Sequence, residues 1–173
     1  RSGLRLLQPP QPLESVTAPH MELDVLGLLG ACSYALDCVE AELVHVTTFH
    51  AKRVAYMSVC TAEQFGVSGE ALQDLAVCAL LHDNALTQYL HEEFRGDSSA
   101  AECLPELPHL GAHCVMGEEN ISALPFHTNV ENIILYHHEN ADGSGPFGKT
   151  WQEIPLGAVM EELDRRSRKI GNL

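Results

Sequence analysis

The chain has 173 residues, enough for one domain with a substantial hydrophobic core. Its formal net charge of −14 argues against a nucleic-acid polymer as partner, because such a surface repels a phosphate backbone. No apolar run reaches the roughly 20 residues that cross a bilayer, so we expect no membrane insertion and a cytoplasmic location. The six cysteines show no CxxC spacing and are expected to be reduced thiols, mostly buried.

Helical periodicity dominates the chain from residue 21 onward. Residues 1–20 hold four prolines and little periodicity, which predicts an extended arm or linker before a domain over 21–173. Thr47 or Thr48 is expected to cap the second helix, Gly66 to end it, and Ser68 to cap the third. Helices are predicted over 22–44, 47–65, 69–82, 84–94, 109–122, 128–138 and 156–169, with loops over 95–106 and 139–150. The pattern predicts an all-α bundle of about six to seven helices.

Histidine is the unusual component of the composition. The chain has ten, where average usage gives roughly four. Several stand in polar clusters near the ends of apolar helices, and these clusters are His50, His82-Asp83, His113 and His137-His138-Glu139. The remaining histidines are expected to be surface or locally hydrogen-bonded residues, and they are His20, His45, His91, His109 and His127.

Polar groups that emerge from core helices need partners, because an unpaired buried polar group costs roughly 1–3 kcal/mol. A divalent metal ion supplies such partners, since neutral imidazole and carboxylate suit zinc, manganese, iron or nickel. The two oxygens of Asp83 allow one carboxylate to bridge two ions. The clusters therefore predict a dinuclear site that activates water and holds a phosphate.

Five segments in chain order carry a family resemblance. They read FHAKRVA (49–55), LLHD (80–83), HCVMG (113–117), YHHENADGSG (136–145) and EIPL (153–156). Together they resemble the HD-GYP family, a branch of the HD-domain metal-dependent phosphohydrolases. The resemblance runs from about His50 to Leu156 and implies an HD-type helical bundle.

The resemblance implies two divalent metal ions. The first would be bound by His50, His82 and Asp83, and the second by Asp83, His113, His137 and His138. Asp164 is the nearest candidate for the family's last ligand, but its spacing is one residue short and a solvated acidic face explains it equally well. Asp83 with His82 would carry the catalytic centre.

The loop after the histidine pair would shape the mouth of the site, through Asp142, Gly143 and Gly145. Glu139 is expected to orient a ligating histidine as its hydrogen-bond partner. As an alternative, the loop is only a tight turn.

Three positions depart from the family pattern. Leu86 stands where members carry a lysine that faces the substrate phosphate. The Gly-Tyr-Pro triad is incomplete, because Gly145-Pro146-Phe147 lacks the tyrosine between glycine and proline. Val46 stands where members with a third metal carry a glutamate, which favours two ions over three.

The resemblance implies hydrolysis of a cyclic dinucleotide, most often cyclic di-GMP, without a protein nucleophile. Another phosphate ester remains open as the substrate, as do a homodimer and a fused sensory domain as partners. The alternative is a degenerate, non-catalytic HD-type module that binds metal and a nucleotide or protein partner. The missing lysine and tyrosine favour this alternative, whereas the complete histidine set opposes it.

Overall fold

The computed structural model describes residues 24–44, 49–94 and 111–158. Five α-helices lie in these ranges: α1 (Val25–Val44), α2 (His50–Gln64), α3 (Glu70–Leu80), α4 (Leu86–Phe94) and α5 (Gly111–Ile121). A short 3₁₀ helix, η2 (Leu156–Ala158), follows near the end. The described ranges contain no strand beyond one isolated bridge between Asp142 and Thr150. The all-α class is confirmed, and these ranges hold fewer α-helices than the six to seven predicted for the chain.

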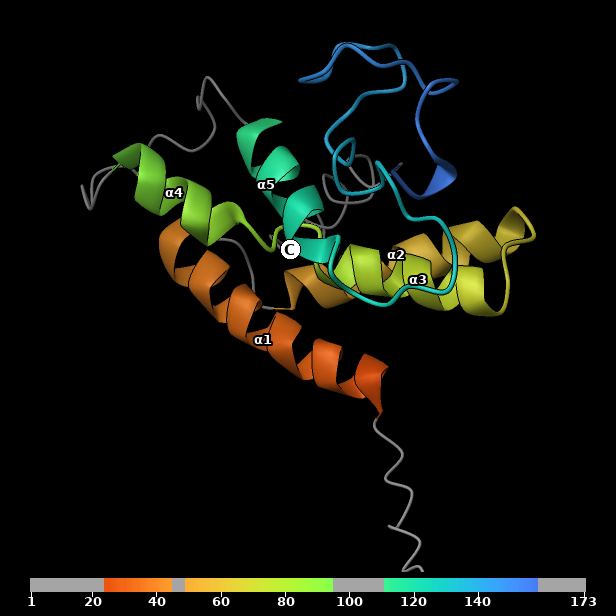
Figure 1. Cartoon of the computed structure of the whole chain (residues 1–173), viewed down its shortest axis with the longest axis horizontal. Coiled ribbons are helices and arrows are strands. Elements are labelled where there is room, and N and C mark those ends of the chain that lie inside the picture. The colour runs from red at the N-terminus through yellow and green to blue at the C-terminus, as the bar shows by residue number, and fades with distance from the viewer. Residues whose placement is uncertain (1–23, 45–48, 95–110, 159–173) are drawn as a thin grey trace, which may run out of the picture.

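The helices α2 and α3 lie side by side at the centre of the bundle, with α1 below them in the view of Figure 1. The helices α4 and α5 lie together on one side, and the turn-rich segment after α5 returns past α2 and α3 (Figure 1). The core lies between these elements, where Val54, Cys78, Ala79 and Ile134 are completely buried. Within the described residues, no helix combines the length and the apolar character needed to span a bilayer.

The first turns of α2 and α3 are not capped as predicted. The N-cap of α2 is Phe49, at a left-handed φ of 66°, and the N-cap of α3 is Gly69 rather than Ser68. Neither has a side-chain cap, and Thr47 and Thr48 lie outside the described residues. At α2 a carboxylate from another helix accepts a free N–H, since Asp37 Oδ1 is 2.9 Å from the Ala51 nitrogen. The predicted helix end is confirmed at Gly66, which has a φ of 81°.

The segment predicted as a helix over 128–138 forms successive turns instead. Asn132 adopts a left-handed φ of 69°, which interrupts helical geometry. Glu118 of α5 takes the hydrogen bonds that a helix would make internally, since its carboxylate accepts the N–H groups of Asn132 (2.6 Å) and Leu135 (2.9 Å). The apolar periodicity correctly marks residues that face the core, because Ile133 and Ile134 are buried. The N–H groups of Asn132 and Leu135, however, bond to the side chain of Glu118 and not to backbone carbonyls one turn earlier.

The predicted termini fall mostly outside the described part. The arm over 1–20 and most of the helix predicted over 156–169 lie there, and only 156–158 are seen, as η2. The cysteines in the described ranges form no disulfide, but the expectation that most are buried is wrong there. Cys78 and Cys114 are buried, Cys60 is half-buried, and Cys32 and Cys38 are exposed.

Candidate metal centre

Four separate parts of the chain bring histidines to one buried point. His50 is the first residue of α2, the His82-Asp83 pair lies in the turn after α3, and His113 lies in α5. His137 and His138 come from the turns that follow. All five imidazoles are buried, and the Asp83 side chain is 11% exposed. Six of the residues predicted for the site therefore lie together, whereas Asp164 lies outside the described residues.

The Asp83 carboxylate lies at the centre of the cluster, and its two oxygens face different histidines. Oδ2 is 3.0 Å from His82 Nε2 and 3.7 Å from His50 Nε2. Oδ1 is 3.4 Å from His113 Nε2 and 3.5 Å from His137 Nε2. Each oxygen thus has its own pair of imidazole nitrogens, which is the arrangement a bridging carboxylate between two ions requires.

Two of the histidines are oriented by backbone carbonyls. His82 Nδ1 lies 2.9 Å from the oxygen of Ala79, and His137 Nδ1 lies 2.6 Å from the oxygen of Ile134. A proton on each Nδ1 makes these hydrogen bonds and leaves Nε2 with a lone pair directed at Asp83. This tautomer is the one that binds a metal through Nε2.

Burial and charge set the protonation states that metal binding needs. Burial, together with the adjacent His138, lowers the pKa of His137 to about 3, so His137 is neutral at pH 7. Burial alone would raise the pKa of Asp83, but His82 and three further imidazoles hold it well below its ordinary value. A neutral imidazole beside an ionised carboxylate is a suitable ligand pair for a divalent cation.

The donor atoms fall into two groups that fit two ions. One holds His50, His82 and Asp83, and the other holds His113, Cys114, His137 and His138, with the atoms of each group within 4.8 Å of one another. His137 Nε2, the nitrogen that faces Asp83, is buried and makes no hydrogen bond within the described part of the chain. A divalent ion would bind such a nitrogen at little desolvation cost, so the residues fit the metals that the resemblance implies.

Gly117 explains how α5 approaches the turn of Asp83 so closely. A Cβ atom here would lie 3.1 Å from Ile134 Cγ2 and 3.2 Å from Asn84 Nδ2. Asn84 follows Asp83 and donates hydrogen bonds to the carbonyls of Leu81 (2.8 Å) and Gly117 (3.2 Å). The glycine four residues after His113 therefore lets the His113 helix pack directly on the turn that carries Asp83.

Asp37 is a buried acidic residue that the sequence did not single out as part of the site. It is 1% exposed, and its bond to the Ala51 N–H holds the start of α2, where His50 stands. A negative charge at a helix N-terminus is also favourable. The available signal was an aspartate in the middle of an apolar helix, which periodicity alone treats as a polar interruption.

The structure gives Glu139 a different contact from the one expected. Instead of a histidine, its carboxylate contacts the loop over 140–150, where Oε1 accepts the Phe147 N–H (2.5 Å) and Oε2 the Lys149 N–H (2.8 Å). Gly145 packs against it, since a Cβ there would lie 2.7 Å from the Glu139 Cα. Glu139 thus ties the loop to the histidine pair, and Gly145 is required for that close packing.

The outer part of this loop is held by its own hydrogen bonds. Asp142 is exposed and accepts bonds from the Ser144 N–H (3.0 Å) and hydroxyl (2.7 Å), which lower the pKa of Asp142. Gly143 adopts a φ of 80°, a conformation that favours glycine. This part is an ordered turn at the surface, and a role in shaping the site stays a prediction.

Two residues at the departures from the family pattern, Leu86 and Phe147, take part in packing. Leu86 is 8% exposed at the start of α4, and the Phe147 ring lies edge-on to Tyr136 with centroids 5.6 Å apart. Val46 lies outside the described residues. Among the histidines predicted to be peripheral, His91 and His127 are exposed, and the other three lie outside the described residues.

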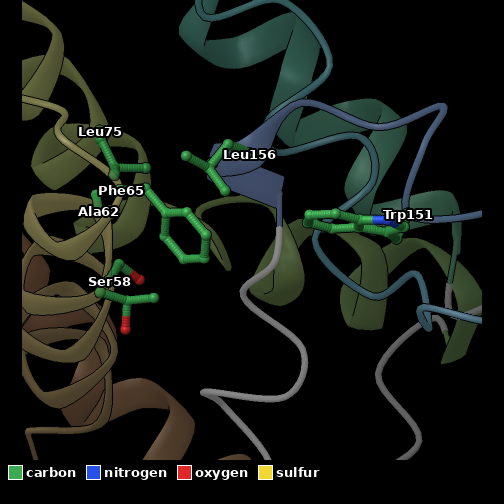
Figure 2. A pocket seen from close by; sticks show the side chains of 8 residues that line it. Ser58, Ala62, Phe65, Leu75, Trp151 and Leu156 are labelled. Carbon is green, nitrogen blue, oxygen red and sulfur yellow. The ribbon is translucent and has the colours of Figure 1, made fainter.

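The structure also has an apolar surface pocket away from the histidines. Its lining includes Phe65, Leu75, Trp151 and Leu156, with Ser58 and Ala62 at one wall (Figure 2). None of the metal-centre residues lines it. The chemistry of the site therefore rests on the buried cluster and not on this pocket.

Comparison with known proteins agrees with the fold and the cluster. The family model described as HD domain matches residues 37–160, most of the chain and all six clustered ligand candidates. No curated protein and no solved structure matches. HD domains are generally metal-dependent hydrolases, and the described residues contain the histidine and aspartate groups that such chemistry uses. The chain belongs to the HD-domain family of metal-dependent phosphohydrolases.

Proposed function

We propose that the chain hydrolyses a phosphodiester through two divalent ions, with a cyclic dinucleotide such as cyclic di-GMP as substrate. The proposal rests on the position of the Asp83 carboxylate, whose two oxygens face separate pairs of histidines. A carboxylate that only closed a hydrogen-bonded core would not need four imidazole nitrogens around it. The ions would be iron, manganese, zinc or nickel, which share these ligands.

Bound ions would supply the positive charge and the activated water that phosphodiester hydrolysis requires. The residues of this chain do the rest. Asp83 holds the two ligand sets together, while the carbonyls of Ala79 and Ile134 keep the Nε2 atoms of His82 and His137 aimed inward. Burial of these side chains limits competing water and strengthens their interaction with a charged substrate.

Charge supports the need for metal at this site. The chain has a net charge of −14, and Leu86 occupies the position where the family presents a lysine to the phosphate. A phosphodiester would therefore meet a repulsive surface unless cations reversed the local sign. Two divalent ions beside Asp83 would do so.

The experiment is metal analysis joined to turnover. Protein purified without chelator should contain about two equivalents of metal per chain and hydrolyse cyclic di-GMP. His138→Ala should abolish turnover and lower bound metal, whereas His127→Ala, at an exposed site, should change neither. Equal loss in both variants, or metal that stays absent after manganese or iron is added, would overturn the proposal.

A degenerate module is the second candidate, favoured by one observation. Leu86 is buried, so the position where the family carries its phosphate-facing lysine is used for packing. Such a module would retain metal and bind a nucleotide or protein partner without turnover. Stoichiometric metal together with inactivity on cyclic di-GMP, its linear product and simple phosphate esters would support this candidate.

A further inference from the structure

Cys114 lies beside the second group of ligands. It follows His113 on α5, is completely buried, and places Sγ 3.7 Å from His113 Nε2. Its sulfur also lies within 4.8 Å of the donor nitrogens of His137 and His138. No expectation from the sequence gave this cysteine a role beyond that of a buried thiol.

The spacing of these atoms matches the edges of a metal coordination sphere. With Zn–N of about 2.05 Å and Zn–S of about 2.3 Å, a tetrahedral site has N–N edges of about 3.3 Å and N–S edges of about 3.6 Å. The observed separations are 3.1 Å between the Nε2 atoms of His113 and His138, and 3.7 Å between His113 Nε2 and Cys114 Sγ. Both lie close to the tetrahedral values.

A second buried cysteine shows that this placement is not a general effect of burial. Cys78 is equally inaccessible, but it packs among Val54, Ala79 and Ile134 in the hydrophobic core. Burial there raises the pKa of the Cys78 thiol to about 12. Cys78 belongs to neither group of candidate ligands in the described residues.

We propose that Cys114 is a ligand of the second metal ion, which it binds together with His113, His137 and His138 and in addition to the bridging Asp83. This inference rests on the metal centre of the proposed function and specifies its ligands. A thiolate makes the second position softer than the first, where Asp83 and two imidazoles bind. The second position should therefore prefer zinc or iron to manganese, and the two ions of one molecule would differ in kind.

Cobalt substitution tests the inference without measuring activity. Chelated protein is loaded with Co²⁺, and a thiolate ligand then gives an intense sulfur-to-cobalt absorption band in the near ultraviolet. The band should be present in the wild type and in Cys78→Ser, and absent in Cys114→Ser. The last variant should also bind its second zinc more than about 10-fold more weakly.

X-ray absorption of the zinc-loaded wild type provides a measurement without substitution, in case Cys114→Ser does not fold. One sulfur at about 2.3 Å should accompany the nitrogen and oxygen ligands. Two bound ions without sulfur scattering would overturn the role of Cys114 and leave the dinuclear centre intact. A band that persists in Cys114→Ser would do the same, and failure to bind any ion would overturn both.

Discussion

Replacement of Glu139 by glutamine is the most direct test of how the loop after the histidine pair is held. Glu139 is 4% exposed, and each of its oxygens accepts a different backbone N–H, from Phe147 at 2.5 Å and from Lys149 at 2.8 Å. Glutamine has one oxygen. Whichever way its amide is turned, one of these N–H groups faces an NH₂ donor and loses its acceptor.

The size of the effect follows from that loss. A hydrogen bond to a charged acceptor contributes about 1.5–3 kcal/mol, and the abandoned N–H is only partly solvated. We therefore expect Glu139→Gln to lower the free energy of unfolding by about 2–3 kcal/mol. For a chain of this length, that corresponds to a fall in Tm of about 4–12 °C.

The assay is thermal unfolding of metal-free protein by circular dichroism, so that metal affinity does not enter. Glu153→Gln is the matched control, because Glu153 also accepts a backbone N–H of the same loop but is exposed. Its bonds from Thr150 both go to one oxygen, Oε2, which glutamine can keep. We expect a loss below about 0.5 kcal/mol there. Equal losses in the two variants would refute the assignment of Glu139 as the tether of this loop.

Three further predictions concern the metal centre. Asp37→Ala should cost about 1–3 kcal/mol in urea unfolding because the first turn of α2 loses its acceptor, whereas Asp37→Asn should stay within about 1 kcal/mol; equal losses would count against a role in holding His50. Zinc at 100 times its Kd should stabilise the chelated His127→Ala variant by about 2.7 kcal/mol, or about 5–11 °C in Tm. The same addition should stabilise His82→Ala far less, and similar shifts in the two variants would show adventitious binding. Leu86→Lys should raise turnover of cyclic di-GMP by restoring a cation near the phosphate, and unchanged turnover would contradict this reason.

The helices and the convergence of the ligands could be predicted because their signals are local. Helical spacing locates α1 to α5 to within a few residues, and polar clusters that end apolar segments mark the points where helices meet. His82-Asp83 directly follows a run of buried residues, and His137-His138 comes shortly after the buried Ile133 and Ile134. Their ligation of metal stays a prediction.

The parts that were missed depend on contacts between distant residues. The segment predicted as a helix over 128–138 forms turns, and Glu118 accepts the N–H groups of Asn132 and Leu135 there. No local sequence pattern predicts this contact with α5. Asp37 likewise acts on α2 from another helix. Glu139 was expected to contact a histidine because it follows His138 in the sequence. Adjacency does not determine where a carboxylate points, and this one points to the loop.

The pocket in Figure 2 has a practical consequence for spectroscopy. Trp151 is the sole tryptophan of the chain, it is 47% exposed, and it lies at the edge of that pocket. Its backbone N–H donates to the carbonyl of Ala141, so the backbone of Trp151 is tied to the loop that Glu139 holds. Tryptophan emission from this protein therefore reports one location. A shift in its wavelength would register movement of the loop beside the histidine pair, or occupation of the pocket, without any introduced label.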